Sequence, residues 1–173
     1  DVARRVAKQG YVALALDYLS PEGGTPETGN AEADATKGRE MIAALPWERA
    51  NDFGKAAVAF LKKHPQSTGK VGALGFCWGG QAVNRLAAND PTLDAGVVYY
   101  GRQAPLDEAP RIKAPLLFNY AEMDAGIAAG GPLLEGGGGP GVEPDPGVVQ
   151  EVLGVEPRRG DSSRRAAPGG YRL

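Results

Sequence analysis

The sequence predicts an α/β fold: a mainly parallel β-sheet with helices on both faces. Short apolar runs, which are typical of strands buried on both sides, recur at residues 11–16, 71–75, 95–100 and 115–120. Segments with the apolar spacing of helices lie between these runs. Strands that alternate with helices build parallel sheets, and the active groups of such folds lie at the carboxyl ends of the strands.

Helices are predicted in the segments around these strands. The first covers residues 1–9 and ends at Gly10, a residue that readily adopts the conformation that ends a helix. Asn30 can cap a second helix that reaches about Leu45. A third is predicted over residues 50–63, where apolar side chains recur at helical spacing.

The turn after the second apolar run, within residues 71–80, holds Cys77, the single cysteine of the chain. Gly75 and Gly79 lie two residues before and two residues after it. A nucleophile at a strand-to-helix turn has a strained backbone, which requires small neighbours at these two positions. The positive end of the following helix favours the thiolate. We therefore predict Cys77 as a nucleophile, with the Trp78 backbone N–H as an oxyanion donor; a buried structural cysteine is the alternative.

Four stretches of sequence together resemble the dienelactone hydrolase family. They are GFCWGG at this turn, GYVALALDYLSPEGGTP over residues 10–26, and VVYYGRQAP over 97–105 followed by KAPLLFNYAEMD over 113–124. The resemblance covers residues 1–127, in order, and implies an incomplete α/β-hydrolase domain that is truncated at its N-terminus. It also implies hydrolysis of small carboxylic esters or lactones, a Cys–His–Asp triad and no cofactor.

The resemblance assigns the acid of the triad to Asp124 and leaves the histidine unassigned. Asp124 follows Cys77 by 47 residues and comes just after a predicted strand, where this hydrolase order places the acid. A loop aspartate that caps a turn is the alternative. No histidine follows Asp124, and the single histidine, His64, lies at a predicted helix end, where we expect a solvated cap. The chain therefore lacks the expected histidine.

Aromatic residues near the predicted strand ends and one arginine are candidates for binding the substrate. Trp78 and the pair Tyr99-Tyr100 can form an aromatic wall for a small acyl or lactone substrate, and Arg102 can bind a substrate carboxylate with its guanidinium fork. Ordinary core packing and a solvated loop arginine are the alternatives. Dienelactone-specific members of the family have an arginine in the loop after the first strand, whereas residues 19–23 of this chain contain none. This difference argues against a dienelactone as the substrate.

Composition excludes several other classes of function. The 173-residue chain has a formal net charge of −2, which gives no electrostatic reason to expect nucleic acid or an acidic membrane as a partner. No apolar run approaches the roughly 18 residues that a membrane span requires. The single cysteine excludes an internal disulfide and a zinc site built from several thiolates. We expect no metal, a small ester or lactone as the partner, and a cytoplasmic location.

The composition changes abruptly after Asp124. Of the last 49 residues, 13 are Gly and 6 are Pro, a share above the roughly 25–30% that marks low-complexity sequence. These residues contain five Arg and no Lys. We therefore predict that residues 128–173 form a Gly/Pro/Arg-rich tail, either disordered or the product of a frameshift shortly after Asp124; a natural flexible tail is the alternative.

A second function remains open at this point. A chain that has an activated Cys77 but no histidine to complete turnover would be a catalytically impaired remnant or a redox-sensitive thiol protein. The chain has no second cysteine to resolve an oxidised thiol, which weighs against an intramolecular switch.

Overall fold

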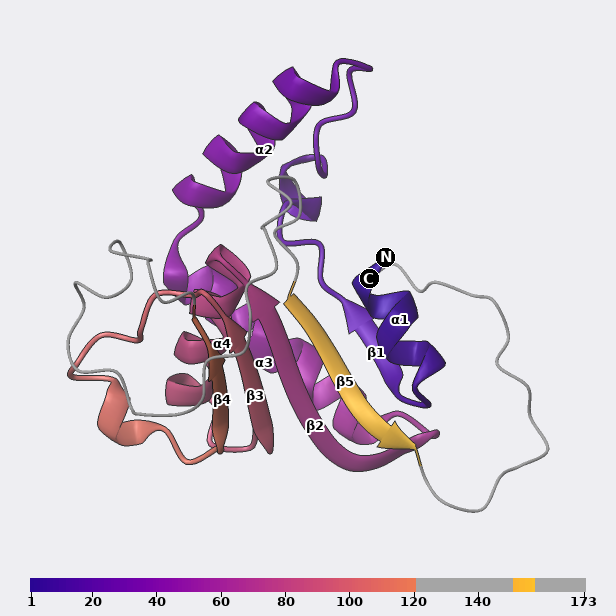
Figure 1. Ribbon diagram of the computed structural model, residues 1–173, viewed down its shortest axis with the longest axis vertical. Coiled ribbons are helices and arrows are strands. Elements are labelled where there is room, and N and C mark those ends of the chain that lie inside the picture. The colour runs from indigo at the N-terminus through magenta and orange to yellow at the C-terminus, as the bar shows by residue number, and fades with distance from the viewer. Residues whose placement is uncertain (121–150, 158–173) are drawn as a thin grey trace.

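A computed structural model describes residues 1–120 and 151–157 (Figure 1). The described strands form one five-stranded sheet in the order β1-β5-β2-β3-β4. β2 pairs parallel with β3, and β3 pairs parallel with β4, whereas β5 is antiparallel to both β1 and β2. Strands β1 to β4 therefore all run in the same direction. The strands are β1 (Val12–Ala15), β2 (Ser67–Phe76), β3 (Ala95–Tyr99), β4 (Leu116–Asn119) and β5 (Glu151–Pro157).

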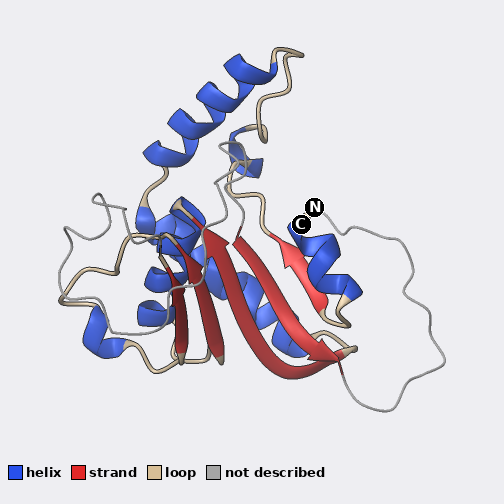
Figure 2. Cartoon of the chain, in the orientation of Figure 1, coloured by secondary structure: helices blue, strands red, loops and turns tan. Residues whose placement is uncertain are grey.

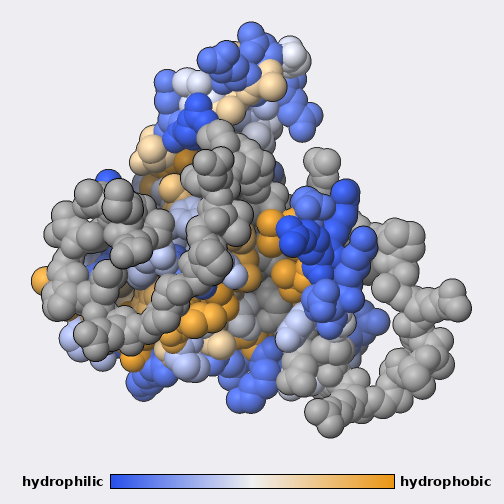
Figure 3. Space-filling model, in the orientation of Figure 1, coloured by the Kyte–Doolittle hydropathy of each residue, from blue (hydrophilic) through white to orange (hydrophobic). Residues whose placement is uncertain are grey.

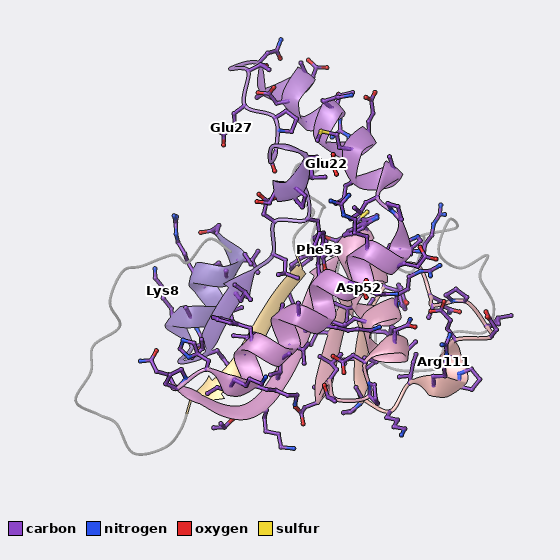
Figure 4. The ribbon with its side chains drawn as sticks, turned by 180° about the vertical axis from the view of Figure 1, so that it is seen from behind. Lys8, Glu22, Glu27, Asp52, Phe53 and Arg111 are labelled. Carbon is purple, nitrogen blue, oxygen red and sulfur yellow. The ribbon has the colours of Figure 1, made fainter. Side chains whose placement is uncertain are left out.

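Helices lie on both faces of this sheet. Helices α3 and α4 cross the back of the sheet, and α1 lies in front of it beside β1 (Figures 1 and 4). No helix among the described residues is both long and apolar enough to span a membrane. The helices are α1 (Val2–Lys8), α2 (Ala31–Ala44), α3 (Trp47–Lys63) and α4 (Trp78–Asn89), with short 3₁₀ helices at Ser20–Glu22 and Ala109–Arg111 (Figure 2).

The predicted fold class is confirmed, because the strands β2 and β3 are parallel and α4 connects them. The arrangement is consistent with part of an α/β-hydrolase fold. The side chain of Asn30 accepts a hydrogen bond from the Ala33 N–H at 3.1 Å, as expected of the cap of α2. Two elements begin earlier than predicted. α3 starts at Trp47, directly after Pro46, and β2 starts at Ser67.

Strand β5 was not predicted. It lies within residues 128–173, whose composition predicts a low-complexity tail, and it separates β1 from β2 in the sheet. Its sequence, EVLGVEP, is a short run with three large apolar residues, which the high Gly and Pro content of the surrounding 49 residues obscures. The rest of the predicted tail, and the end of the predicted domain at residues 121–127, lie outside the described residues.

The main core lies between the sheet and helices α3 and α4. Its most deeply buried members are Val58, Val71, Val83 and Val98, each 0% exposed. The two helices approach each other closely at Gly54, where an added Cβ would come within 2.9 Å of Leu86 Cδ1. This contact holds α3 against α4, and so fixes the helix that begins at the cysteine.

A second core cluster lies where α2 meets the rest of the chain. Tyr18, Leu19, Ile42, Leu45 and Ala50 are buried in it. Helix α2 itself projects away from the sheet, and its surface is mostly hydrophilic (Figure 3). Only Ile42 of this helix is buried. The cluster therefore anchors α2 at its carboxyl end.

An ionic cluster joins α3, β2 and β3 at the amino end of the sheet. Asp94 lies 2.6 Å from Lys62 Nζ and 3.0 Å from Lys70 Nζ, and it accepts a hydrogen bond from the Val71 N–H at 2.9 Å. Burial by itself raises the pKa of Asp94, but the hydrogen bonds from Lys62, Val71 and Lys70 outweigh it and lower the pKa to about 2. The carboxylate thus stabilises the folded chain.

We predict that Asp94→Asn lowers the free energy of unfolding at pH 7 by about 2 kcal/mol, from the fall in pKa from its ordinary value of 3.8. Because the pKa is lower in the folded chain, the contribution is complete above about pH 4 and is lost as the pH falls through 2. Urea unfolding at several pH values measures this difference. Glu22→Gln, which breaks the exposed ion pair with Arg49, is the control, and we expect a loss below about 1 kcal/mol. A wild-type advantage over Asp94→Asn that grows toward pH 2 would contradict this account.

Candidate active site

Cys77 lies at the carboxyl end of the sheet, between β2 and α4, and its side chain is exposed. Its backbone has φ 52° and ψ −116°, a conformation that costs a non-glycine residue about 1–3 kcal/mol. Two backbone hydrogen bonds hold it there. The Cys77 N–H donates to the Tyr99 carbonyl at 3.0 Å, and the Cys77 carbonyl accepts from the Gln81 N–H at 3.1 Å. The predicted turn is therefore present, and the alternative of a buried cysteine is wrong.

Backbone packing around this turn excludes side chains at several positions. A Cβ on Gly75 would lie 2.2 Å from the Gly79 carbonyl oxygen, which confirms the predicted need for small residues at these two positions. A second approach was not predicted: a Cβ on Gly101 would lie 2.4 Å from the carbonyl carbon of Gly80. The first turn of α4 is therefore wedged between the end of β2 and the segment after β3.

Trp78 is the first residue of α4. The first N–H groups of a helix have no acceptor within it, so the Trp78 N–H is available to a ligand beside Cys77. The Trp78 ring packs into the second core cluster. It stacks on Trp47, with ring centroids 5.0 Å apart, and meets Tyr18 edge-on at 5.1 Å. The ring is therefore core packing, which is the alternative to an aromatic wall.

Tyr100 lies close to Cys77 at the same edge of the sheet. Its backbone has φ 40°, and its N–H donates to the Asn119 carbonyl at 2.8 Å. Burial raises the pKa of the Tyr100 hydroxyl, and negative charge on Cys77 raises it further. Tyr100 is thus a neutral hydroxyl near the sulfur at neutral pH. Its role in binding a substrate stays a prediction.

Arg102 lies two residues farther along the chain, and its side chain is exposed. Within the described residues, its guanidinium forms no ion pair. Its backbone carbonyl accepts a hydrogen bond from the buried side chain of Asn84 at 2.8 Å. This contact fixes the loop after β3 and leaves the Arg102 side chain in solvent, so its predicted role in binding a carboxylate stays a prediction.

The described structure places neither the predicted acid of the triad nor the single histidine of the chain beside Cys77. Asp124 lies outside the described residues. His64 is the C-cap of α3, as predicted, and lies near the start of β2, whose ten residues span about 30 Å to the end that bears Cys77. Its Nδ1 accepts a hydrogen bond from the Gln66 N–H at 3.3 Å. His64 is therefore a helix cap far from the sulfur.

The described residues offer no set of side chains of the kind that holds metal ions in proteins. Among residues 1–120 and 151–157, no group of three or more His, Cys, Asp or Glu side chains could hold a metal ion. The features that remain are an exposed thiol in a strained turn, a free helix N–H beside it and a neighbouring tyrosine.

The chain matches the sequence model of a known protein family over most of its length. The sequence model of the dienelactone hydrolase family matches residues 1–135. The chain belongs to the dienelactone hydrolase family. The match includes Cys77 and Asp124, and it extends slightly beyond the end of the resemblance noted at residue 127.

Several curated relatives of this dienelactone hydrolase family chain carry the name carboxymethylenebutenolidase. A protein of Methylorubrum extorquens, provisionally given that name, is 36% identical over 138 residues, which are 73% of this chain and 46% of the relative. The carboxymethylenebutenolidase of Pseudomonas putida is 32% identical over 124 residues, 70% of this chain and 52% of the relative. A Rattus norvegicus homolog of the same name is 29% identical over 126 residues, 73% of this chain and 49% of the relative. The chain thus spans about half the length of these relatives.

We predict that Gly101→Ala destabilises the chain by about 1–3 kcal/mol, because the new Cβ overlaps the backbone of Gly80. The first turn of α4 should move, so Cys77 should also react differently with iodoacetamide. Thermal unfolding and labelling rates measure both effects. Gly38→Ala is the matched control, since its Cβ would come no closer than 3.8 Å to Pro26, and we expect it to be neutral or stabilising by up to about 1 kcal/mol. Equal stability of the two variants would contradict the close approach.

Proposed function

We propose that this chain acts in the hydrolysis of small carboxylic esters or lactones, with Cys77 as the nucleophile. The observation that carries the proposal is the backbone of Cys77, which is held at φ 52° while its side chain is exposed at the carboxyl end of the sheet. A strained backbone conformation lowers the stability of the folded chain, and residues in such conformations cluster at active sites. The family of the chain and the names of its relatives support the same class of reaction.

The chemistry follows from the groups beside the sulfur. The Cys77 thiolate attacks the carbonyl carbon of the ester, a C–S bond forms, and the carbonyl oxygen becomes an oxyanion next to the Trp78 N–H. The C–O bond then breaks, and the leaving alcohol takes a proton from water or from a general acid. Hydrolysis of the thioester by water returns the thiol and releases the acid.

The proposed site has three further residues. We assign Asp124 as the acid of the triad, on its place in the family match, and Tyr100 and Arg102 as residues that contact the substrate. Tyr100 lies near the sulfur with its hydroxyl protonated, so it can donate a hydrogen bond. No histidine follows Asp124 in the chain, which leaves the second step without its usual general base. Deacylation should therefore be slow.

A redox-sensitive thiol is the second candidate, and the exposure of Cys77 favours it. A peroxide can oxidise an exposed thiolate to a sulfenic acid and is itself reduced to water, and small thiols in a reducing compartment can reduce the sulfenic acid again. This candidate fits the expected cytoplasmic location and needs no histidine. It differs from the first in requiring no acyl transfer.

We predict a burst of p-nitrophenolate from p-nitrophenyl acetate followed by a stall, because Cys77 is acylated but deacylation lacks a base. Loss of a general base typically slows a step by about 10²–10⁴-fold. Stopped-flow absorbance measures the burst, and intact mass measures the acetyl group on the chain. Cys77→Ala should abolish the burst, whereas His64→Ala, the control, should leave it unchanged. A burst that persists in Cys77→Ala would defeat the proposal, and a burst lost in His64→Ala would show that His64 takes part.

A further inference from the structure

Both tryptophans of the chain meet beside Cys77. Trp47 is the first residue of α3, and Trp78 is the first residue of α4. Their rings are stacked and nearly parallel, with an interplanar angle of 15° and ring centroids 5.0 Å apart. Trp78 also contacts Tyr18, from the segment after β1, edge-on. The side chain that directly follows the nucleophile is therefore held by two other segments of the chain.

Arg85 completes this arrangement from farther along α4. Its Cζ lies over the Trp47 ring, 4.7 Å from the centroid. Trp78 and Arg85 are seven residues apart, two turns or roughly 10 Å along the helix. That distance fits a flat ring inserted between them, so the Trp47 ring lies between the Trp78 ring and the Arg85 guanidinium.

The charge and contacts of Arg85 show that its position is specific. Its Nη1 pairs with Glu108 Oε1 at 3.4 Å, and its side chain is only 17% exposed. Its Nε is buried and has no hydrogen-bond partner in the described part of the chain. A buried guanidinium usually has all its donors satisfied. In this chain the Arg85 Nε–H forms no such hydrogen bond, and the guanidinium instead lies over the face of the Trp47 ring, an arrangement that cation–π attraction favours.

We propose that Trp47 is a positioning residue for acylation. Held between Trp78 and Arg85, it fixes the Trp78 ring and, through it, the Cys77–Trp78 peptide whose N–H binds the oxyanion. The strained Cys77 backbone needs such support, because a strained conformation persists only where its surroundings determine it. The glycine contacts hold the backbone of this turn against β2 and the segment after β3, and the Trp47 ring holds the Trp78 side chain. The inference rests on the proposed function of Cys77.

Two reactions of Cys77 distinguish a role of Trp47 in positioning the Trp78 N–H from a role in folding. Acylation by p-nitrophenyl acetate passes through an oxyanion and needs the Trp78 N–H, whereas alkylation by iodoacetamide needs only the thiolate. We expect Trp47→Ala to slow acylation at least tenfold, a part of the roughly 10²–10³-fold that one oxyanion donor contributes, while alkylation changes less than about twofold. Trp47→Phe keeps a flat ring and should restore most of the acylation rate. If circular dichroism shows Trp47→Ala unfolded, Trp47→Leu replaces it with the same expected result.

Phe53→Ala is the matched control. Phe53 lies on the same helix (Figure 4) and packs against the same cluster, with its ring 6.0 Å from Tyr18. Its aromatic contacts do not include Trp78, so both reactions should stay within about twofold of wild type. Any one of three results would overturn this inference while leaving the proposed function intact. They are unchanged acylation in the folded Trp47 variant, a parallel fall in its acylation and alkylation rates, and an equal fall in the acylation rate of Phe53→Ala. A wild-type chain that is never acylated at Cys77 would overturn the proposed function and this inference with it.

Discussion

The close approach of the start of α4 to the ends of β2 and β3 is the constraint on which the rest of the site depends. The backbones meet at Gly75 and Gly79 on one side and at Gly80 and Gly101 on the other, with no room for a Cβ at the first and last of these positions. This packing forces the turn at Cys77 into a positive φ and turns its side chain outward. The exposure of Cys77, its backbone strain and the nearby helix N–H all follow from these two close backbone contacts.

The surrounding structure keeps that contact in place. β2 and β3 must stay parallel and in register so that their carboxyl ends reach the turn together, and Asp94 ties the opposite ends of the two strands to α3. On the back of the sheet, Gly54 lets α3 pack directly on Leu86 of α4. The helix that starts at the cysteine is thus held along its length by the core and at its first turn by glycines.

Local patterns in the sequence predicted what local physics determines. The glycines around Cys77, the cap at Asn30 and the helix end at His64 depend on neighbouring residues, and each prediction is confirmed. The stack of Trp47 on Trp78 and the approach of Gly101 to Gly80 join segments that are far apart in the chain. The spacing of residues along the sequence therefore did not predict these contacts. The doublet Gly79-Gly80 and the glycine directly after Tyr99-Tyr100 were the only hints. Strand β5 was missed because its short apolar run lies among residues dominated by Gly and Pro.

The central claim is that Cys77 is an acyl-accepting nucleophile and not merely an exposed thiol. The most direct measurement treats the folded chain with a β-lactone, a strained electrophile that a nucleophile opens to a stable acyl adduct, and then maps the adduct by peptide mass spectrometry. The account predicts one equivalent of thioester on Cys77, removed by hydroxylamine and lost when the chain is first unfolded in urea. Absence of an adduct on Cys77, or equal labelling of folded and unfolded chains, would contradict it.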